Sequence, residues 1–256
     1  MAALSRTRHR YGRHPSQVAD LWRANGQAGA VPVVVLYHGG FWRFAYTKRI
    51  MNGLAAAIAS RGLAVWNVEY RRLGMPGGGW PGTFEDAEAA LHHVAKVDGL
   101  DCARVVTCGH SAGGHLSLWV AGRNAAARAD GRAGGVVVRG ALSLAGVSDL
   151  RTASNLGLGN RAVDRLLSTG AQSGAGRYEA CSPIEMLPFG LPQVLVHGLS
   201  DVVVPATMSE EYCKRAEAAG DNATFVPLEG VGHRELINPR SLAWASALAQ
   251  LEALTC

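Results

Sequence analysis

The sequence GHSAG at residues 109–113 constrains the fold of this chain more than any other stretch. It stands where a short apolar run, typical of a buried strand, gives way to a helical pattern. A G-x-S-x-G sequence between a strand and a helix indicates a nucleophile elbow, in which a sharp turn lifts the serine hydroxyl clear of the sheet. The small residues Gly109 and Gly113 allow the strand and the helix to approach closely. We therefore predict that Ser111 is a nucleophile and that the Ala112 N–H, at the first turn of the helix, can donate to an oxyanion.

Strand patterns and helix patterns alternate along most of the chain. The run at residues 31–37 is continuously apolar, which is typical of a strand buried on both faces of a sheet. Strands that alternate with helices predict an α/β fold, with a mostly parallel sheet covered by helices on both faces. We expect strands at residues 17–22, 31–37, 63–69, 104–108, 136–144, 193–197 and 223–228, and helices at residues 46–60, 83–97, 112–122, 206–219 and 239–254.

Two stretches depart from this alternation. Residues 145–190 hold one short helical pattern at 161–167 and a flexible segment at 168–176. An insertion of this kind within a single domain covering residues 1–256 predicts a small cap over the site. The loop at residues 71–82 is dense in glycine and is predicted to border a pocket.

The charge and the apolar runs argue against several classes of protein. The net charge is +5, yet the arginines are scattered and form no long run of like charges. The densest basic stretch, Arg6–Arg13, is predicted to be a solvated tail rather than a nucleic-acid arm. No run reaches the ~18 apolar residues of a membrane span, and residues 1–30 lack the apolar core of a signal peptide. We expect a soluble, cytoplasmic protein without nucleic-acid or membrane partners, and its oligomeric state stays open.

Cysteine spacing and glycine motifs give no indication of a metal or a cofactor. The five cysteines are widely spaced and include no C-x-x-C pair, which predicts reduced thiols rather than disulfides or a zinc site. The glycine run at residues 77–79 lacks the Lys and the Ser or Thr that follow in a phosphate loop, and no dinucleotide fingerprint is present. We expect no cofactor and no metal.

A serine nucleophile needs a base, because its hydroxyl is too weakly acidic to attack unaided at neutral pH. His233 is the leading candidate, since it lies in a glycine-bearing loop directly after the last predicted strand. Asp201, which follows the strand at residues 193–197, is the leading acid to orient His233. Asp149 is the alternative acid, and its other role would be to cap a helix. The weaker candidates for the base stand in the basic stretch, within a helix or at a strand end: His9, His14, His92, His93 and His197.

The sequence HGGFW at residues 38–42 follows a buried strand. Gly39 and Gly40 can adopt backbone angles that turn their N–H groups toward a reacting oxygen, and an ordinary glycine exit from a strand is the alternative. Four aromatic residues are candidate pocket walls, with packing in the core as the alternative for each: Phe41, Trp42, Tyr70 and Trp80. Three arginines are candidate cations for that pocket, with a surface position as the alternative: Arg43, Arg71 and Arg72.

These motifs together resemble those of α/β-hydrolases of the esterase and lipase branch that carry an HGG oxyanion motif. The resemblance rests on HGGFW at residues 38–42, GHSAGGH at residues 109–115, HGLSD at residues 197–201 and the loop that bears His233, in the chain order Ser, Asp, His. The EYRR run at residues 69–72 adds similarity to kynurenine-formamidase-like and small carboxylesterase-like members. The chain has room for only one or two short strands before the core, fewer than fuller esterase members have.

The resemblance implies a serine hydrolase that cleaves a small ester or amide, as a carboxylesterase or an arylformamidase does. In that pattern Ser111 attacks the carbonyl carbon, His233 transfers the proton and Asp201 orients His233. The oxyanion would be bound by the N–H groups of Gly39, Gly40 and Ala112. The short, glycine-rich cap argues against a tunnel for a long acyl chain. Acyl transfer by an acyltransferase, thioesterase or cyclase with the same three residues is one alternative, and a binding protein without catalysis is the other.

Overall fold

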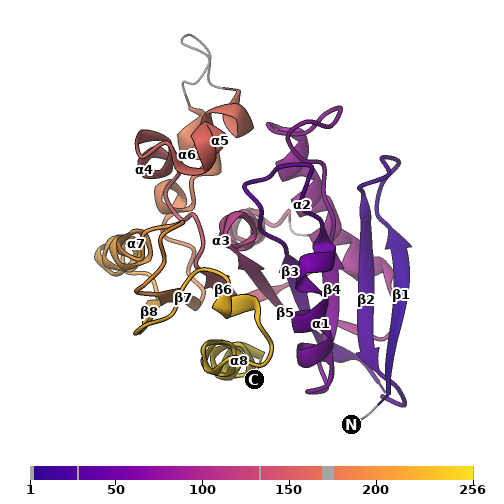
Figure 1. The fold of residues 1–256 in the computed structure, drawn as a ribbon. Helices are drawn as coiled ribbons and strands as arrows, with labels where there is room; N and C mark the ends of the chain where they lie inside the picture. The colour runs from indigo at the N-terminus through magenta and orange to yellow at the C-terminus, as the bar shows by residue number, and fades with distance from the viewer. Residues whose placement is uncertain (1–2, 28, 133, 169–175, 256) are drawn as a thin grey trace.

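One mixed sheet runs through the molecule (Figure 1). The computed structural model describes residues 3–27, 29–132, 134–168 and 176–255, and these form an eight-stranded sheet in the order β1-β2-β4-β3-β5-β6-β7-β8. β1 pairs with β2 and β2 with β4 in antiparallel fashion, and the other neighbours are parallel. The strands are β1 (Leu4–Arg10), β2 (Val18–Ala24), β3 (Val31–Tyr37), β4 (Ala64–Val68), β5 (Leu100–His110), β6 (Val138–Leu144), β7 (Gln193–Gly198) and β8 (Ala223–Leu228). The predicted α/β fold with a mostly parallel sheet is confirmed.

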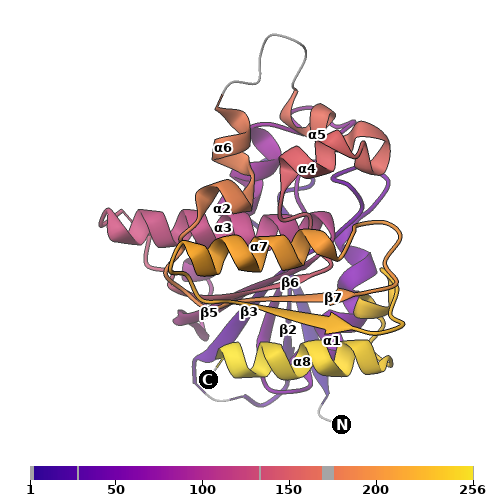
Figure 2. The ribbon, with the colours of Figure 1, turned by 90° about the vertical axis from the view of Figure 1, so that its left-hand side faces the viewer.

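Helices cover both faces of this sheet (Figure 2). One face carries α1 (Asn52–Ala59) and α8 (Leu242–Thr255), and the other carries α2 (Gly82–His93), α3 (Ala112–Ala129) and α7 (Thr207–Ala218). Successive side chains of a strand point to opposite faces. In β3, Val33 and Val35 pack in the core beneath α2, α3 and α7. Val34 and Leu36 pack in the core beneath α1 and α8, which explains why the whole strand is apolar.

The basic amino-terminal stretch is a strand, and the predicted solvated tail was wrong. Arg6 and Arg8 of β1 lie 2.5 Å and 3.1 Å from the carboxylate of Asp20 in β2, and Lys48 bonds the same carboxylate. Burial alone raises the pKa of Asp20, but the hydrogen bonds from these three cations lower it overall. A buried carboxylate needs such partners, so β1 is held against β2. The strand predicted at residues 17–22 is consequently an inner strand and not an edge strand.

The helical elements otherwise lie near their predicted positions. Two of the predicted helix ranges are part 3₁₀ turn: η1 (Lys48–Met51) precedes α1 and η2 (Val94–Lys96) follows α2. A further 3₁₀ turn, η4 (Glu235–Ile237), precedes α8. The largest difference is in α3, which continues to Ala129, seven residues beyond the helix predicted at residues 112–122. Its last turns are rich in alanine and arginine, both strong helix formers, and this composition extends the helix beyond the apolar pattern.

Residues 145–168 and 176–190 form α4 (Leu150–Asn155), α5 (Leu158–Leu167), α6 (Arg177–Cys181) and η3 (Pro183–Met186), which lie together at the top of Figures 1 and 2. α5 contains the predicted helical pattern, whereas α4 was not predicted. Asp149 begins α4 by accepting the N–H groups of Arg151 and Thr152 at 2.9 Å and 3.1 Å. The alternative acid therefore has its capping role. Residues 169–175 of the predicted flexible segment lie outside the described residues, and the function of this region as a cap stays a prediction.

Candidate active site

Ser111 stands in a sharp turn between β5 and α3. Its backbone has φ 56° and ψ −121°, a combination that costs free energy for a residue with a Cβ and persists only where its surroundings fix it. A Cβ on Gly109 would lie 2.1 Å from the Gly113 carbonyl oxygen, and a Cβ on Gly113 would lie 2.1 Å from the Tyr37 carbonyl oxygen. No larger side chain fits at either position without movement of the backbone. Packing therefore requires both glycines of the predicted motif.

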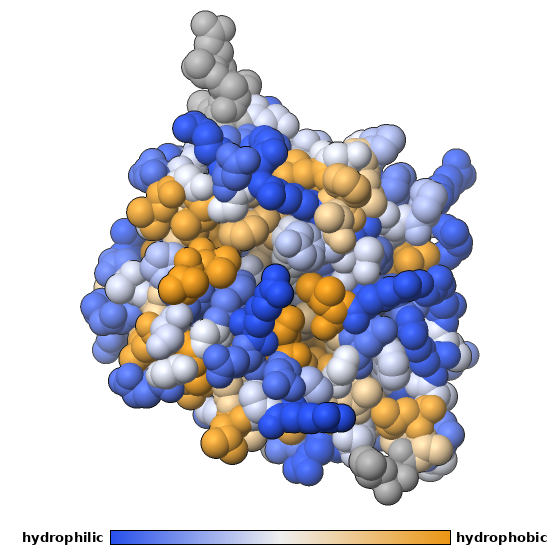
Figure 3. Space-filling view, viewed as in Figure 1, coloured by the Kyte–Doolittle hydropathy of each residue, from blue (hydrophilic) through white to orange (hydrophobic). Residues whose placement is uncertain are grey.

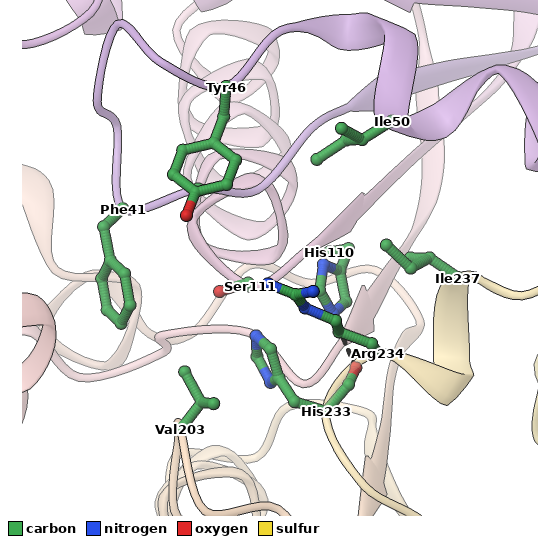
Figure 4. A pocket seen from close by; sticks show the side chains of 10 residues that line it. Phe41, Tyr46, Ile50, His110, Ser111, Val203, His233, Arg234 and Ile237 are labelled. Atoms are coloured by element: carbon green, nitrogen blue, oxygen red, sulfur yellow. Dashed lines mark hydrogen bonds between the residues drawn. The ribbon is translucent and has the colours of Figure 1, made fainter.

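Asp201 and His233 are brought together as the sequence predicts. Oδ2 of Asp201 accepts the Nδ1–H of His233 at 2.6 Å, and the Asp201 side chain is fully buried. Oδ1 of Asp201 accepts the backbone N–H groups of Val203 and Val204 at 2.8 Å and 3.0 Å. The bond to Asp201 assigns the proton to Nδ1 of His233, so that Nε2 has a free lone pair. Figure 4 shows the His233 ring turned toward Ser111.

A second histidine, His197, supports the carboxylate of Asp201. Its Nε2 lies 3.2 Å from Oδ2 of Asp201 and 3.0 Å from the Val204 carbonyl oxygen. Since both of these atoms are acceptors, Nε2 carries a proton and His197 donates. Burial alone raises the pKa of Asp201, but the hydrogen bonds from the two histidines and from a backbone N–H lower it below its usual range. Asp201 therefore stays ionised, and His197 acts on the acid rather than on Ser111.

His110, directly before Ser111, holds the loop that carries His233. Its Nε2 donates to the His233 carbonyl oxygen at 2.9 Å, and the two ring centroids are 4.5 Å apart. Burial, followed by the proximity of His233, lowers the pKa of His110 to about 3, so its ring is neutral at physiological pH. No role was predicted for His110. Its place inside the G-x-S-x-G motif was the signal that could have found it.

Gly39 and Gly40 lie in the turn after β3, beside Ser111. A Cβ on Gly39 would lie 3.1 Å from the Cβ of Ser111, and Gly40 has φ 111°, which glycine adopts far more readily than other residues. Among the described residues, neither glycine donates its N–H to another backbone carbonyl. The N–H of Ala112 is at the first position of α3, where an α-helix offers no acceptor. All three predicted oxyanion donors thus stand close to the serine in the fold.

A buried network fixes this glycine turn. Nε2 of His38 lies 2.9 Å from Oε1 of Glu69, and the His38 ring stacks on Tyr70 with 4.4 Å between centroids. Nη1 of Arg72 lies 3.1 Å from the same oxygen, and the Lys48 backbone N–H donates to Oε2 at 3.1 Å. Burial alone raises the pKa of Glu69, but His38, Arg72 and the backbone N–H lower it overall. The EYRR run therefore positions the HGG turn rather than the substrate.

Ser111 and His233 line one cavity of about 290 Å³ (Figure 4). Its other walls are mainly apolar and are formed by Gly40, Phe41, Tyr46, Ile50, His110, Val203, Arg234 and Ile237. In the space-filling view, hydrophobic residues near the middle of the molecule stand beside strongly hydrophilic ones (Figure 3). The cavity is close to the low end of the size range of pockets that bind small molecules. Its dimensions suit a small ligand.

One of the four predicted aromatic walls, Phe41, lines this cavity. Trp42 is fully buried in the core beneath α2 and α3, and Tyr70 is fully buried with its hydroxyl donating to the His38 carbonyl at 2.7 Å. Trp80 lines a different cavity, between α2 and α3. The prediction was wrong for these three residues. Trp42 and Tyr70 bury their large apolar surfaces in the core, whereas Trp80 is partly buried against the core and faces the other cavity.

The three arginines considered as a cation for the pocket are engaged elsewhere. Arg71 is paired with Asp86 at 2.7 Å, Arg72 is paired within the network that fixes the glycine turn, and Arg43 donates to a carbonyl in α5. The arginine at the cavity is Arg234, which was not predicted although it follows His233 directly. Four more wall residues were not predicted: Tyr46, Ile50, Val203 and Ile237. Of these, Val203 stands close to a motif, the HGLSD sequence at residues 197–201.

Across the part of the chain that the structure describes, no group of three or more His, Cys, Asp or Glu side chains could hold a metal ion. The cysteines in this part are free thiols: Cys102, Cys108, Cys181 and Cys213. None of the described helices combines the length and the apolar character needed to cross a membrane.

Comparisons with known sequences match this chain to esterases. The family model BD-FAE matches residues 19–215. Esterase LipC of Mycobacterium tuberculosis is 29% identical over 249 residues, which cover 90% of this chain and 60% of LipC. The probable isoprenylcysteine alpha-carbonyl methylesterase ICMEL1 of Oryza sativa is 26% identical, and 56% of its length is covered. Kynurenine formamidase of Danio rerio is 22% identical over 231 residues, which cover 89% of this chain and 74% of that protein. The chain thus spans less than two thirds of LipC and ICMEL1.

Solved structures match over nearly the whole chain. A truncated carbohydrate esterase from gut microbiota superposes with a TM-score of 0.82 at 20% identity, covering 99% of this chain and 96% of that one. A bacterial heroin esterase superposes with a TM-score of 0.77 at 23% identity, covering 99% and 85%. At this level of identity the likeness concerns the fold. It confirms the α/β-hydrolase fold that the motifs predicted.

Proposed function

This chain belongs to the BD-FAE family, and from that premise we propose that it is a serine hydrolase that cleaves small carboxylic esters through an acyl-Ser111 intermediate. One observation carries the proposal. Ser111 and His233 line the same cavity, and His233 is bonded through Nδ1 to the buried carboxylate of Asp201. This is the arrangement by which a histidine can take a proton from a serine hydroxyl. The esterase names of the relatives support the same class of reaction.

In the first half of the proposed reaction, Oγ of Ser111 forms a bond to the carbonyl carbon of the ester while Nε2 of His233 takes the hydroxyl proton. The ionised Asp201 stabilises the resulting imidazolium. When the tetrahedral intermediate collapses, the carbon–oxygen bond to the leaving group breaks and His233 returns the proton to that oxygen. An alcohol leaves, and the acyl group stays on Ser111.

In the second half, water attacks the acyl carbon and gives a proton to Nε2 of His233. The bond to Oγ then breaks, the proton moves to Ser111 and a carboxylic acid is released. The N–H groups of Gly39, Gly40 and Ala112 would bind the oxyanion in both halves. Loss of one such donor typically costs about 3 kcal/mol of transition-state stabilisation.

The cavity restricts the substrate that this chemistry can use. A volume of about 290 Å³ with Phe41, Ile50 and Ile237 in its walls favours a short acyl group and a compact leaving group. A long acyl chain would need a tunnel in addition to this cavity. We therefore propose a carboxylesterase of small substrates.

Arylformamidase activity is a second candidate. The Danio rerio relative is named a kynurenine formamidase, and the sequence motifs of this chain resemble such enzymes. The triad would act in the same way, with the formyl group on Ser111 and an arylamine as the leaving group. Phe41 offers one aromatic wall against which an arylamine can pack.

A fluorophosphonate probe and two substrates test the proposal. The wild-type protein is expected to be labelled at Ser111 and to hydrolyse p-nitrophenyl acetate, and N-formylkynurenine measured beside it decides between esterase and formamidase. The variant Ser111→Ala is expected to lose labelling and at least about 10⁴-fold of turnover with an unchanged thermal unfolding midpoint. Product analysis in the presence of an alcohol or a thiol separates hydrolysis from acyl transfer. Turnover by Ser111→Ala at a rate close to wild type would refute the mechanism.

A further inference from the structure

Arg234 gives the cavity a single fixed charge. Among the described residues that line the cavity, it is the one Lys, Arg, Asp or Glu. Figure 4 shows its side chain reaching across the cavity, in this view over Ser111, while the apolar side chains of Ile50 and Ile237 lie to one side. A cation in a mainly apolar wall is the kind of polar group that fixes the orientation of a ligand in a small-molecule pocket.

The nearby carboxylates do not neutralise Arg234. The ion pairs within the described ranges include none that joins Arg234 to an acidic side chain. Its neighbour Glu235 accepts the backbone N–H of Gly232 at 3.0 Å, and Asp201 is buried and bonded to two histidines. The guanidinium is therefore exposed at the cavity with its hydrogen-bond donors available to a ligand.

We propose that Arg234 forms a subsite for a carboxylate carried by the substrate, so that this enzyme prefers esters or amides with an anionic group next to the scissile bond. The proposal rests on the hydrolase function proposed above and specifies its substrate class. A guanidinium presents parallel N–H donors that match the two oxygens of a carboxylate. The subsite is adjacent to His233 in the chain, so a bound carboxylate would also place the scissile carbonyl relative to the base.

Hydrogen bonds fix the backbone on both sides of Arg234. The carbonyl of His233, the preceding residue, accepts a hydrogen bond from the buried His110. Arg234 itself begins η4, and its carbonyl accepts the N–H of Ile237 at 3.2 Å. The side chain is exposed, but the backbone that carries it is tied to the residue next to the nucleophile.

Two pairs of matched esters test the subsite. The first pair, 4-acetoxybenzoate and its methyl ester, differs in a charge on the leaving group; the second, monophenyl succinate and phenyl pentanoate, differs in a charge on the acyl group. The variant Arg234→Gln is expected to lose about tenfold in kcat/KM for the anionic member of at least one pair and less than about twofold for the neutral member. The intrinsic reactivity of each ester cancels, because variant and wild type are compared on the same ester.

Further variants separate the subsite from other roles. Arg234→Lys is expected to keep part of the preference, and Arg234→Glu to reverse it. Arg240→Gln removes an exposed arginine that does not line the cavity. It should leave kcat/KM unchanged for the anionic and the neutral esters alike. Equal losses on anionic and neutral esters in Arg234→Gln, which would indicate a role toward the oxyanion or the fold, would overturn the proposal, as would no loss on any ester.

Binding without turnover keeps this proposal distinct from the proposed function. Titration calorimetry with benzoate and with benzamide is expected to show tighter binding of benzoate to the wild type and loss of that preference in Arg234→Gln. If the wild type bound benzoate in this way but hydrolysed none of the esters, the proposed function would fail and the subsite would stand. Equal binding of benzoate by wild type and Arg234→Gln, together with ester turnover, would refute the subsite alone.

Discussion

The floor and the rim of the cavity are built in different ways. The floor comprises the catalytic residues and those that hold them, Gly39, His110, Ser111, Asp201 and His233, of which His110, Ser111 and His233 line the cavity. The rim comprises Phe41, Tyr46, Ile50 and Arg234, which line it as well. Ser111 is 2% exposed and the Asp201 side chain is fully buried, whereas Tyr46 and Ile50 are 39% and 40% exposed. The floor is held by close backbone contacts and buried hydrogen bonds, while the rim consists of side chains that project from loops and from η1.

Because of this difference, the residues that carry out the reaction are distinct from the residues that select the substrate. In the floor, a single added carbon on Gly109 or Gly113 would collide with the backbone, so the position of Ser111 depends on the packing of β5 against α3. On the rim, a side chain such as Arg234 can change without moving those contacts. Changes in the floor should therefore lower turnover of every substrate, and changes on the rim should alter which substrate is used.

The largest expected effect comes from the acid in the floor. Asp201→Asn should lower kcat by about 10³- to 10⁴-fold, because an amide cannot accept from His233, His197 and two backbone N–H groups as the carboxylate does. Steady-state kinetics on p-nitrophenyl acetate measures this loss. The matched control is Asp149→Asn, which weakens only a helix cap and should keep kcat within about twofold. Similar losses in the two variants would contradict the assignment of Asp201.

Two consecutive residues provide the next test, since one lies on the rim and the other in the core. Trp42→Ala should lower the free energy of unfolding by about 3–5 kcal/mol, because Trp42 is fully buried. Phe41→Ala should cost roughly 1 kcal/mol or less and instead raise KM several-fold, because Phe41 lines the cavity. Urea unfolding and steady-state kinetics measure the two quantities.

The conservative variant Trp42→Phe controls for the loss of a large ring. It keeps much of the buried apolar area and removes an Nε1–H that has no hydrogen-bond partner among the described residues. It should therefore retain most of the stability. If Trp42→Ala changed KM more than Phe41→Ala did, the boundary drawn here between core and rim would be misplaced.

The floor could be predicted from the sequence far better than the rim. Ser111, Asp201 and His233 each stand beside glycines or at the end of an apolar run, and the topology of a parallel sheet brings such strand ends to one edge. The rim has no such local signal. Tyr46 and Ile50 line the cavity from the segment between β3 and α1, where no local motif marks them. Trp42, beside Phe41 in the chain, packs in the core beneath α2 and α3 instead.

The amino-terminal strand shows a second limit of the sequence. The arginines of residues 6–13 are typical of a solvated tail, but two of them, Arg6 and Arg8, pair with the buried Asp20 of the neighbouring strand. Asp20, an acidic residue in an otherwise largely apolar strand, was the available signal for such a pairing. Its partners Arg6 and Arg8, however, lie more than ten residues away in the chain. Long-range ion pairs of this kind cannot be derived from local patterns.

The smallest expected effect is a dependence of stability on pH that originates beneath the floor. Burial lowers the pKa of His115, in the first turn of α3, to about 4, against about 6.5 in an unfolded chain. Between these values the unfolded chain binds a proton that the folded protein does not, so the free energy of unfolding falls as the pH falls, by up to about 1.4 kcal/mol per pH unit. Buried His110, with its pKa of about 3, acts in the same direction.

His115→Gln should therefore flatten this slope while His110 continues to contribute. Glutamine can still donate to the Cys181 carbonyl, which His115 Nε2 contacts at 2.9 Å, so the variant is expected to fold. Urea unfolding at several pH values between 4.5 and 6.5 gives the slope, and measurements at pH 7.5 to 8 give the constant cost of the lost packing, which has no bearing on the test. An unchanged slope in the variant would mean that His115 also binds a proton in the folded protein over this pH range. The pKa of His115 would then not be lowered by its burial.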